Sequence, residues 1–352
     1  MKKKTKASKQ KLNNLLMILL LTAVLLIMST YAWFTANRTV NIDAIDVKVA
    51  TSSGLQISAD GITWKTVLTK DDVFSAYNTY GSSVNQLPSI MAPVSSALEL
   101  DANGHLKMFF GKVEANLDTT SDTYGQYLLT STLQTDVASN TVTTTGEFDK
   151  GYYMAFDVFL KVETEASELY MSGSVTEPTT VKGLANAARV ALIKGPNTAA
   201  VDATSGEIQA LPTTGGTVMM WEPNADAHTI NGVNNATALG WATITAGEGN
   251  GTIAYDGVKA EKAGVVLADA TAAKDPDTFA AATPTWATPK SGTPSMLMPG
   301  GLAAGVTKYR IYLWVEGQDV DCENNASGTD VQYDLSFSLD PFATATGGGT
   351  NP

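Results

Sequence analysis

The most regular pattern along this chain is an alternation of apolar and polar residues with a period of two. In Tyr152–Val162 every even-numbered position from 154 onward is apolar, and the pattern recurs in Tyr309–Val315 and Val331–Leu339. Successive side chains of a strand point to opposite faces of its sheet, so this period predicts strands with a buried face. These three segments are the predicted core strands. The turn-rich Gly317–Asp330 between the last two predicts a hairpin or a crossing between sheets.

Shorter stretches with the same alternation predict further strands, whereas a helical period is scarce. The weaker strand candidates are Ile42–Val49, Leu55–Ser58, Ile62–Leu68, Leu106–Val113, Glu168–Ser172 and Arg189–Ile193. A short helical turn is predicted within Leu184–Val190, and Ser75–Tyr80 fits either kind of structure. The chain is therefore predicted to be all-β, with enough residues for one large β domain or two ordinary ones.

Composition divides the predicted β domain into parts. Residues 195–290 are dense in Ala, Thr, Gly, Pro, Asn and Asp and contain only short apolar runs. They predict a long loop-rich insertion or a small, loosely built subdomain. The core of a β-sandwich is expected in residues 33–194 and 291–342. The tail, residues 343–352, has nothing to pack against the core and is predicted to be disordered.

The N-terminus has the features of an export signal. Six lysines in Met1–Asn14 precede the apolar run Leu15–Met28, and the small residue Ala32 stands before Trp33. A basic start, a short apolar core and a small residue predict cleavage between Ala32 and Trp33. The run of 14 residues is short for a spanning helix, although extension into the aromatic residues beyond it reaches marginal length. Residues 1–32 are therefore expected to be a hydrophobic helix that acts as a signal peptide or a signal anchor. The lysines leave the remainder outside the cytoplasm, secreted or on the surface of a bacterium.

Charge and cysteine content narrow the class of protein further. The chain has 23 basic and 35 acidic side chains, and without the six N-terminal lysines its formal charge is −18. Nucleic-acid binding depends on Lys and Arg that neutralise phosphates, so a nucleic-acid partner is not expected. Cys322 is the single cysteine, so no intrachain disulfide can form and the core must hold by packing.

No motif of the chain predicts catalysis. The histidines are His105 and His228, and neither lies in the HExxH pattern of zinc peptidases. Cys322 stands in an acidic turn that suppresses its thiolate, and a GxSxG nucleophile elbow is absent from the sequence. Leu211–Gly215 reads LPTTG, the pattern that sortases recognise, but no apolar span and basic tail follow it closely. A surface turn is the favoured interpretation, and we expect a protein that is not an enzyme.

The acidic turn after residue 315 offers oxygen ligands of the kind that calcium prefers. The candidate calcium ligands are Glu316, Asp319, Asp321 and Glu323. Their spacing does not match an EF-hand, and acidic turns are common on exported proteins, so a turn without calcium is the alternative. No other cofactor is expected. Trp221 and Trp314 are expected to be packing residues rather than a ligand platform.

Two features of the chain resemble exported proteins of known families. The junction Thr30–Phe34 (TYAWF) is similar to that of the fibre proteins typified by TasA and its relative camelysin, whose signal is read by the dedicated peptidase SipW. The segments Met220–Thr229 and Tyr312–Cys322 resemble motifs of large surface proteins of clostridial-type bacteria. The resemblance implies a jelly-roll-like β-sandwich whose N-terminal strand completes a sheet of the next subunit in a filament. Camelysin's peptidase activity is not implied, since no residue matches a catalytic motif.

The expected donor strand lies directly after the predicted cleavage site. Within residues 39–50 the apolar set is Val40, Ile42, Ile45, Val47 and Val49, and its alternation changes phase once. Such a strand either pairs within its own domain or adds to the open edge of a neighbour.

The leading hypothesis is an exported, non-enzymatic structural protein, such as a fibre or biofilm-matrix subunit. Its expected partners are further copies of the chain or other envelope proteins, with a signal peptidase acting during export. The alternative is an adhesin-like surface module that recognises a glycan or a protein through residues 195–290. An envelope hydrolase with an unfamiliar site is the third hypothesis.

Overall fold

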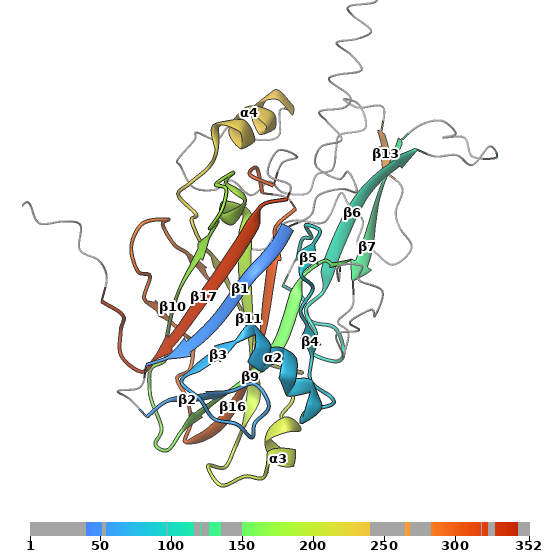
Figure 1. The fold of residues 1–352 in the computed structure, drawn as a ribbon. Helices are drawn as coiled ribbons and strands as arrows, with labels where there is room; N and C mark the ends of the chain where they lie inside the picture. The colour runs from blue at the N-terminus through green and yellow to red at the C-terminus, as the bar shows by residue number, and fades with distance from the viewer. Residues whose placement is uncertain are drawn as a thin grey trace, which may run out of the picture.

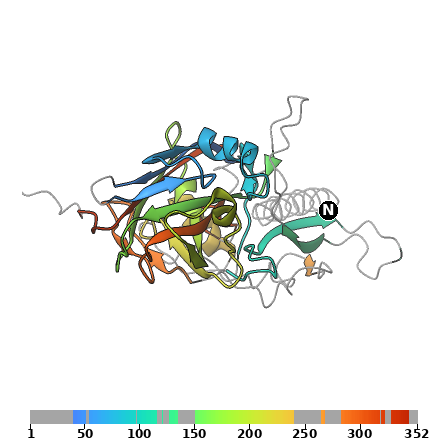
Figure 2. The same cartoon turned by 90° about the horizontal axis from the view of Figure 1, so that it is seen from below.

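The computed structural model describes residues 40–50, 54–96, 98–115, 120, 127–134, 150–239, 265–267, 283–317, 319–322 and 328–343. Two seven-stranded mixed sheets pack against each other, and a third sheet of three strands lies to one side (Figure 1). Seen from below, the two large sheets form the layers of a β-sandwich (Figure 2). The predicted all-β class is confirmed.

The first large sheet contains the N-terminal strand. Its strands follow the order β15-β10-β17-β1-β5-β8, and β3 also pairs with β1. Their bounds are β1 Val40–Val49, β3 Val67–Thr69, β5 Ile90–Met91, β8 Lys150–Gly151, β10 Tyr170–Thr176, β15 Met296–Leu297 and β17 Asp330–Ser338. β1 runs parallel to β17 and antiparallel to β3 and β5. It therefore joins the two halves of this sheet.

The second large sheet follows the order β14-β12-β11-β16-β9-β2, and β4 also pairs with β9. Its bounds are β2 Gln56–Ser58, β4 Asn85–Gln86, β9 Met154–Val162, β11 Ala188–Ala199, β12 Thr217–Glu222, β14 Trp286–Ala287 and β16 Gly305–Val315. The third sheet consists of β6 Met108–Ala115, β7 Tyr127–Gln134 and β13 Val265–Leu267. Short helices connect these strands: α2 Lys70–Ser75, α3 Ser205–Gln209, α4 Ile230–Leu239, and the 3₁₀ turns η3 Ala76–Asn78 and η4 Leu184–Ala187.

The space between the large sheets is filled by the apolar faces that the alternation predicts. The second sheet contributes the fully buried side chains Met154, Phe156, Val158, Leu160, Ile311 and Leu313. The first sheet contributes Val331, Tyr333, Leu335 and Phe337 of β17. The three predicted core strands are thus present as β9, β16 and β17. Because β16 and β17 belong to different sheets, the turn between them is a crossing rather than a hairpin.

The second sheet is also buried on its outer face. All eleven residues of β16 are buried, because a second apolar cluster covers the far side of the strand. In this cluster Tyr153, Tyr312 and Trp314 pack with Val94 and Met108. A strand that is buried on both faces has an almost continuous apolar sequence, as Tyr309–Val315 does.

Part of the range 195–290 belongs to the second sheet. β12 pairs with β11 in antiparallel register from Trp221 opposite Val190 to Thr217 opposite Lys194. Trp221 is buried in the core between the sheets, and Trp314 is buried on the outer side, so both are packing residues as predicted. The range 195–290, predicted from its composition to be loop-rich, therefore contains a core strand. A short apolar run can form a strand when it pairs with a segment far away in the sequence.

Several predicted features lie outside the described residues. These are the apolar run Leu15–Met28, the cleavage site at Ala32 and Trp33, the calcium candidate Glu323, and residues 344–352 of the tail. Of the helices in the described part of the chain, none is long and apolar enough to span a membrane.

Candidate functional site

A buried charged cluster forms where the chain crosses from β16 to β17. Asp319 and Asp321 lie in this turn, and their side chains are 0% exposed. The N–H of Asp321 donates to Oδ1 of Asp319 at 2.9 Å, and the N–H of the buried Cys322 donates to the carbonyl of Asp319 at 3.0 Å. These bonds hold both carboxylates inside the protein.

Arg189 of β11 supplies the positive charge of the cluster. Its Nη2 lies 2.8 Å from Oδ2 of Asp319 and 2.8 Å from Oε1 of Glu222, at the end of β12. Its Nη1 donates to the carbonyl oxygens of Asn186 and Ala188 at 3.1 and 2.8 Å. A guanidinium buried to this degree, with a side chain 2% exposed, depends on protein partners in place of water.

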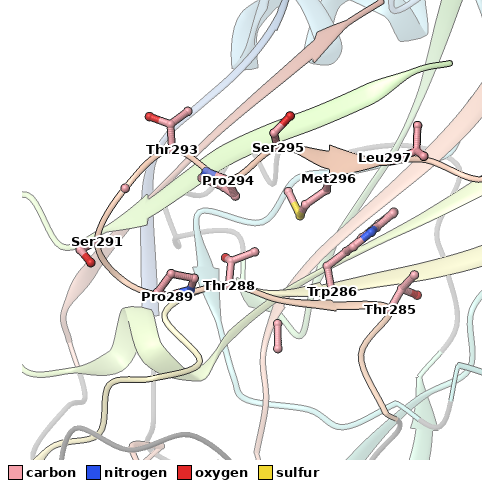
Figure 3. A pocket seen from close by; sticks show the side chains of 12 residues that line it. Thr285, Trp286, Thr288, Pro289, Ser291, Thr293, Pro294, Ser295, Met296 and Leu297 are labelled. Carbon is pink, nitrogen blue, oxygen red and sulfur yellow. The ribbon is translucent and has the colours of Figure 1, made fainter. Parts of the chain in front are cut away.

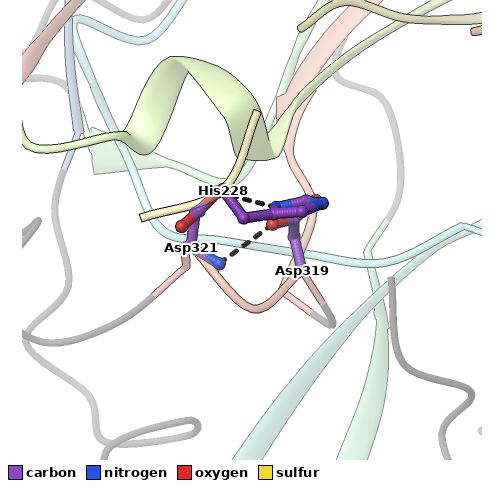
Figure 4. Close-up of side chains that lie close together, drawn as sticks. All are labelled: His228, Asp319 and Asp321. Atoms are coloured by element: carbon purple, nitrogen blue, oxygen red, sulfur yellow. Dashed lines mark hydrogen bonds and ion pairs between the residues drawn. The ribbon is translucent and has the colours of Figure 1, made fainter. Parts of the chain in front are cut away.

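Asp321 accepts hydrogen bonds from two further segments. Its Oδ1 accepts from the N–H and the Oγ1 of Thr229, each at 2.8 Å. Its Oδ2 accepts from Nδ2 of Asn186 at 3.0 Å and lies 3.0 Å from Nδ1 of His228. Two donors on each oxygen fill the acceptor capacity of a carboxylate. Figure 4 shows His228, Asp319 and Asp321 at this point.

The environment of the cluster shifts the protonation of its members. Burial and the Asp321 carboxylate raise the pKa of Asp319 to about 7, against the opposing effect of Arg189 and His228. Burial lowers the pKa of His228, but the hydrogen bond to Asp321 and the carboxylates of Asp319 and Glu222 raise that pKa overall. Nε2 of His228 is buried and has no hydrogen-bond partner among the described residues. Asp319 and His228 therefore keep their protons at a higher pH than exposed groups of the same type do.

Glu316 extends the cluster toward the outer face of the second sheet. Its carboxylate accepts hydrogen bonds from Oγ of Ser95 and, at 3.1 Å, from Nε1 of Trp314. The N–H of Glu316 donates to the carbonyl of Ala187 at 2.7 Å. The crossing is therefore fixed both to η4 and to the segment before β6.

The geometry bears on the predicted calcium ligands. His228, Asp319 and Asp321 each place one ligand atom within 4.8 Å of the others, close enough to hold a metal ion. However, a cation here would compete with Arg189 for Asp319 and with the hydrogen-bond partners that already occupy both oxygens of Asp321. The described contacts therefore make the cluster a charge-paired anchor between strands, and calcium binding stays a prediction.

The cluster unites the two segments that resemble surface-protein motifs. Met220–Thr229 supplies Glu222, His228 and Thr229, and Tyr312–Cys322 supplies Trp314, Glu316, Asp319 and Asp321. Sequence reasoning missed Arg189 and Asn186, which join the two segments. One signal was available, because an arginine in an apolar strand candidate such as Arg189–Ile193 needs a buried partner.

A second buried ion cluster lies on the outer face of β9 and β16. Asp157 lies 2.8 Å from Nε of Arg310 and 3.0 Å from Nζ of Lys308. The hydroxyl of Tyr80 donates to Asp157 at 3.1 Å and accepts from Lys308 at 2.7 Å. Burial raises the pKa of Asp157, but Arg310 and Lys308 lower it overall. This carboxylate stays ionised between two cations, which is a structural role.

The segment Thr285–Leu297 encloses a pocket of ≈ 590 Å³ (Figure 3). It provides β14 at the edge of the second sheet and β15 at the edge of the first, so it spans one open side of the sandwich. Trp286 and Met296 line the pocket from its two arms, and Leu297 is 50% exposed. Apolar walls with serine and threonine hydroxyls suit a neutral ligand.

The predicted donor strand is β1, and it pairs within its own chain. Val40, Ile45, Val47 and Val49 are buried in the core, while the side chain of Ile42 lies outside the described set. The register against β17 shifts between Ile42 and Ile45, at the point where the apolar alternation changes phase.

The LPTTG sequence lies in a folded turn after α3. Leu211 and Thr213 are buried, and Oγ1 of Thr213 donates to the carbonyl of Gly104 at 3.1 Å. The N–H of Gly216 closes the turn by donating to the carbonyl of Thr213 at 2.9 Å. These contacts favour the interpretation as a turn.

Comparisons with protein-family models, with curated proteins and with solved structures found no match to this chain.

Proposed function

We propose that this chain is an exported, non-enzymatic structural protein of a bacterial surface, which self-associates by exchange of its N-terminal strand. The observation that carries the proposal is the position of β1 in the first sheet. One edge of β1 pairs with β17 from Asn41 to Val49, and the other edge pairs with β3 and β5. Among the described strands, no other connects β17 to β3 or β5. The position of β1 is therefore a slot: when β1 leaves, β17 on one side and β3 and β5 on the other each have one unpaired edge.

The slot binds a strand through general features that any copy of the chain possesses. Val40, Ile45, Val47 and Val49 enter the core, and burial of each aliphatic side chain contributes about 1.5–3 kcal/mol. Main-chain hydrogen bonds to the strands on both sides fix the register of the inserted strand. The β1 of a second copy offers the same contacts, so exchange preserves the interior of each subunit.

The route of the chain supports the rest of the proposal. β1 begins eight residues after Ala32, so cleavage there leaves it near a free N-terminus. The successive strands β9, β10 and β11, and likewise β15, β16 and β17, alternate between the two sheets. We infer from this alternation a jelly-roll-like connectivity of the kind that the TasA resemblance implies. The titratable groups of both ion clusters contact one another inside the protein, which favours a structural role over catalysis.

The test is strand complementation. A chain that starts at residue 51 is compared with residues 33–352, and a synthetic peptide of residues 39–50 is added to both. We expect the shortened chain to lose self-association and to bind the peptide, and excess peptide to dissociate assemblies of the longer chain. The matched control peptide carries Val47→Asp, which places a charge in the core. If the shortened chain does not fold, the dissociation experiment still decides. Assemblies that ignore the peptide would contradict strand exchange.

A second candidate is a surface binding module, and the observation that favours it is the pocket of Thr285–Leu297. Trp286 is partly exposed there, so its fluorescence can report a ligand. Titration with neutral oligosaccharides is expected to change this emission if the pocket is the binding site, and the change should vanish in Trp286→Phe. An unchanged emission would leave the structural proposal as the better account.

A further inference from the structure

We propose that Lys308 of β16 and Asp157 of β9 form an amide bond between their side chains, so that a covalent crosslink joins two neighbouring strands of the second sheet. The link is a modification of the folded chain by its own residues. It goes beyond the proposed function and does not depend on strand exchange, because every group that it needs lies inside one subunit.

The register of β9 and β16 places the two side chains within reach of each other. Asp157 is opposite Arg310, and the next pair on the same face is Lys308 opposite Phe159. Nζ of Lys308 lies 3.0 Å from Oδ2 of Asp157, and the two side chains are 5% and 0% exposed. The reacting groups are therefore already held together, and good orientation gives intramolecular reactions effective concentrations of about 10⁵–10⁸ M.

The charges around Lys308 favour the loss of a proton from its ammonium group. Asp157 is shared by two cations, because Nε of Arg310 also lies 2.8 Å from its Oδ1. One carboxylate balances one of these cations and leaves a second positive charge inside the protein. Burial lowers the pKa of Lys308, and so does Arg310, against the opposing effect of Asp157. A lysine that is desolvated beside another cation is activated as a nucleophile.

The hydroxyl of Tyr80 connects the two groups as a proton carrier. It accepts a hydrogen bond from Nζ of Lys308 at 2.7 Å and donates to Oδ2 of Asp157 at 3.1 Å. The carbonyl oxygen of Gln209, also at 3.1 Å, is a second acceptor for its hydrogen. Transfer along this path converts the ion pair into an amine and a carboxylic acid, which are the forms that react.

The bond changes balance without a cofactor or an oxidant. After the proton transfer, Nζ of Lys308 attacks Cγ of Asp157 and the N–C bond forms. The negative charge that develops on Oδ1 faces Nε of Arg310, a donor that is already in place at 2.8 Å. A second proton passes from the nitrogen to Oδ2, the Cγ–Oδ2 bond breaks, and one water molecule leaves. Of the three hydrogens of the ammonium group, one remains as the amide N–H and two leave in the water.

The surroundings protect the amide from hydrolysis. Tyr80, Phe159, Ile208 and Val306 form a buried apolar cluster on this face of the second sheet, and the rings of Tyr80 and Phe159 lie beside Nζ of Lys308. Water is thus excluded from the product as well as from the reacting groups. The crosslink gives a covalent connection between strands to a chain whose single cysteine allows no intrachain disulfide.

Mass spectrometry of the folded chain of residues 33–352 tests the link directly. We expect an intact mass that is lower than the sequence mass by one water molecule. After digestion with trypsin, a branched peptide should join residues 151–161, which contain Asp157, to residues 291–310, which contain Lys308.

A second ion pair of the chain is the internal control. The side chains of Lys65 and Asp72 also form a close pair, but they are 39% and 25% exposed. Water reaches this pair, and no buried hydroxyl carries a proton between its members, so Lys65 and Asp72 should remain unlinked.

Two variants test the roles of the groups. Lys308→Met removes the nucleophile and retains an unbranched side chain, so the intact mass of this variant should equal its sequence mass. Tyr80→Phe retains the ring and removes the hydroxyl. The link should then form about a hundredfold more slowly, which leaves most of the freshly purified variant unlinked.

The outcomes decide the proposal without reference to self-association. An intact mass equal to the sequence mass, with residues 151–161 and 291–310 recovered as separate peptides, would overturn it. A loss of water confined to a single peptide, such as cyclisation at the sequence Asp60–Gly61, would overturn it as well. Equal linkage in Tyr80→Phe would overturn the proton transfer through Tyr80. The unsubstituted chain alone shows whether the link exists, so the test does not depend on how well the variants fold.

Discussion

The buried charged cluster at the crossing from β16 to β17 is held together by single residues that the apolar pattern of the chain does not reveal. Arg189 balances Asp319 and Glu222 from one guanidinium, and Asp321 uses both of its oxygens to collect donors from η4 and from the segment before α4. Each member is buried, so each depends on the others for the polar contacts that water gives an exposed group.

The first prediction concerns the pH dependence of stability. Asp319 has a folded pKa of about 7, above its ordinary 3.8, so its contribution is complete below that ordinary value and is lost as pH rises through about 7. His228 also has a raised pKa, so its contribution is present below 6.5 and is lost as pH rises through the folded value. Both effects have the same sign. The free energy of unfolding should therefore fall as pH rises from 3.8 through about 7 in urea titrations, and the titration of His228 continues this fall above pH 6.5. Asp319→Asn should flatten this fall, and an undiminished slope in that variant would contradict the assignment.

The second prediction concerns Arg189. Arg189→Leu leaves Asp319 and Glu222 buried without their cation, which should lower the free energy of unfolding by about 3–5 kcal/mol. Lys48→Ala is the control, because Lys48 is 44% exposed beside its acidic partners and such pairs contribute about 0–1 kcal/mol. In Asp319→Asn the cost of Arg189→Leu should shrink, since the two groups are coupled. Strict additivity of the two substitutions in chemical denaturation would argue against the pair.

At the scale of elements, the period of two predicted the positions of strands, because local sequence determines them. The three predicted core strands are β9, β16 and β17. The phase change of the apolar alternation in residues 39–50 corresponds to the register shift in the pairing of β1 with β17. The parallel pairing of β1 with β17 was beyond reach, because partner and direction depend on contacts far apart in the sequence. β12 was not predicted as a core strand for the same reason, since its pairing with β11 is also a long-range contact. Of the site, the acidic turn was visible from its composition, whereas its partners Arg189 and Asn186 come from β11 and η4, respectively.

The third prediction tests which segments form the core. Phe156 is 0% exposed between the sheets, and Phe156→Ala should cost about 3–5 kcal/mol through lost burial and a residual cavity. Val181→Ala, at a position 72% exposed, should change stability by less than about 0.5 kcal/mol. Thermal or urea unfolding distinguishes the two. Equal effects would mean that the face of β9 predicted to be inside does not carry the core.

At the scale of the whole molecule, the two large sheets differ in how their strands are held together. The charged cluster and the doubly buried β16 hold the second sheet and the crossing together through buried contacts. The first sheet, in contrast, depends on one strand at the start of the chain to connect its halves. In the proposed assembly, the second sheet and the crossing keep these contacts while β1 pairs in a neighbouring subunit.

Sedimentation velocity of residues 33–352 over a wide concentration range tests this account most directly. The account predicts a distribution that moves to larger species as concentration rises, and that returns to a single subunit when the 39–50 peptide is in excess. A protein that sediments as a monomer at every concentration, with or without salt and calcium, would contradict the proposed strand exchange.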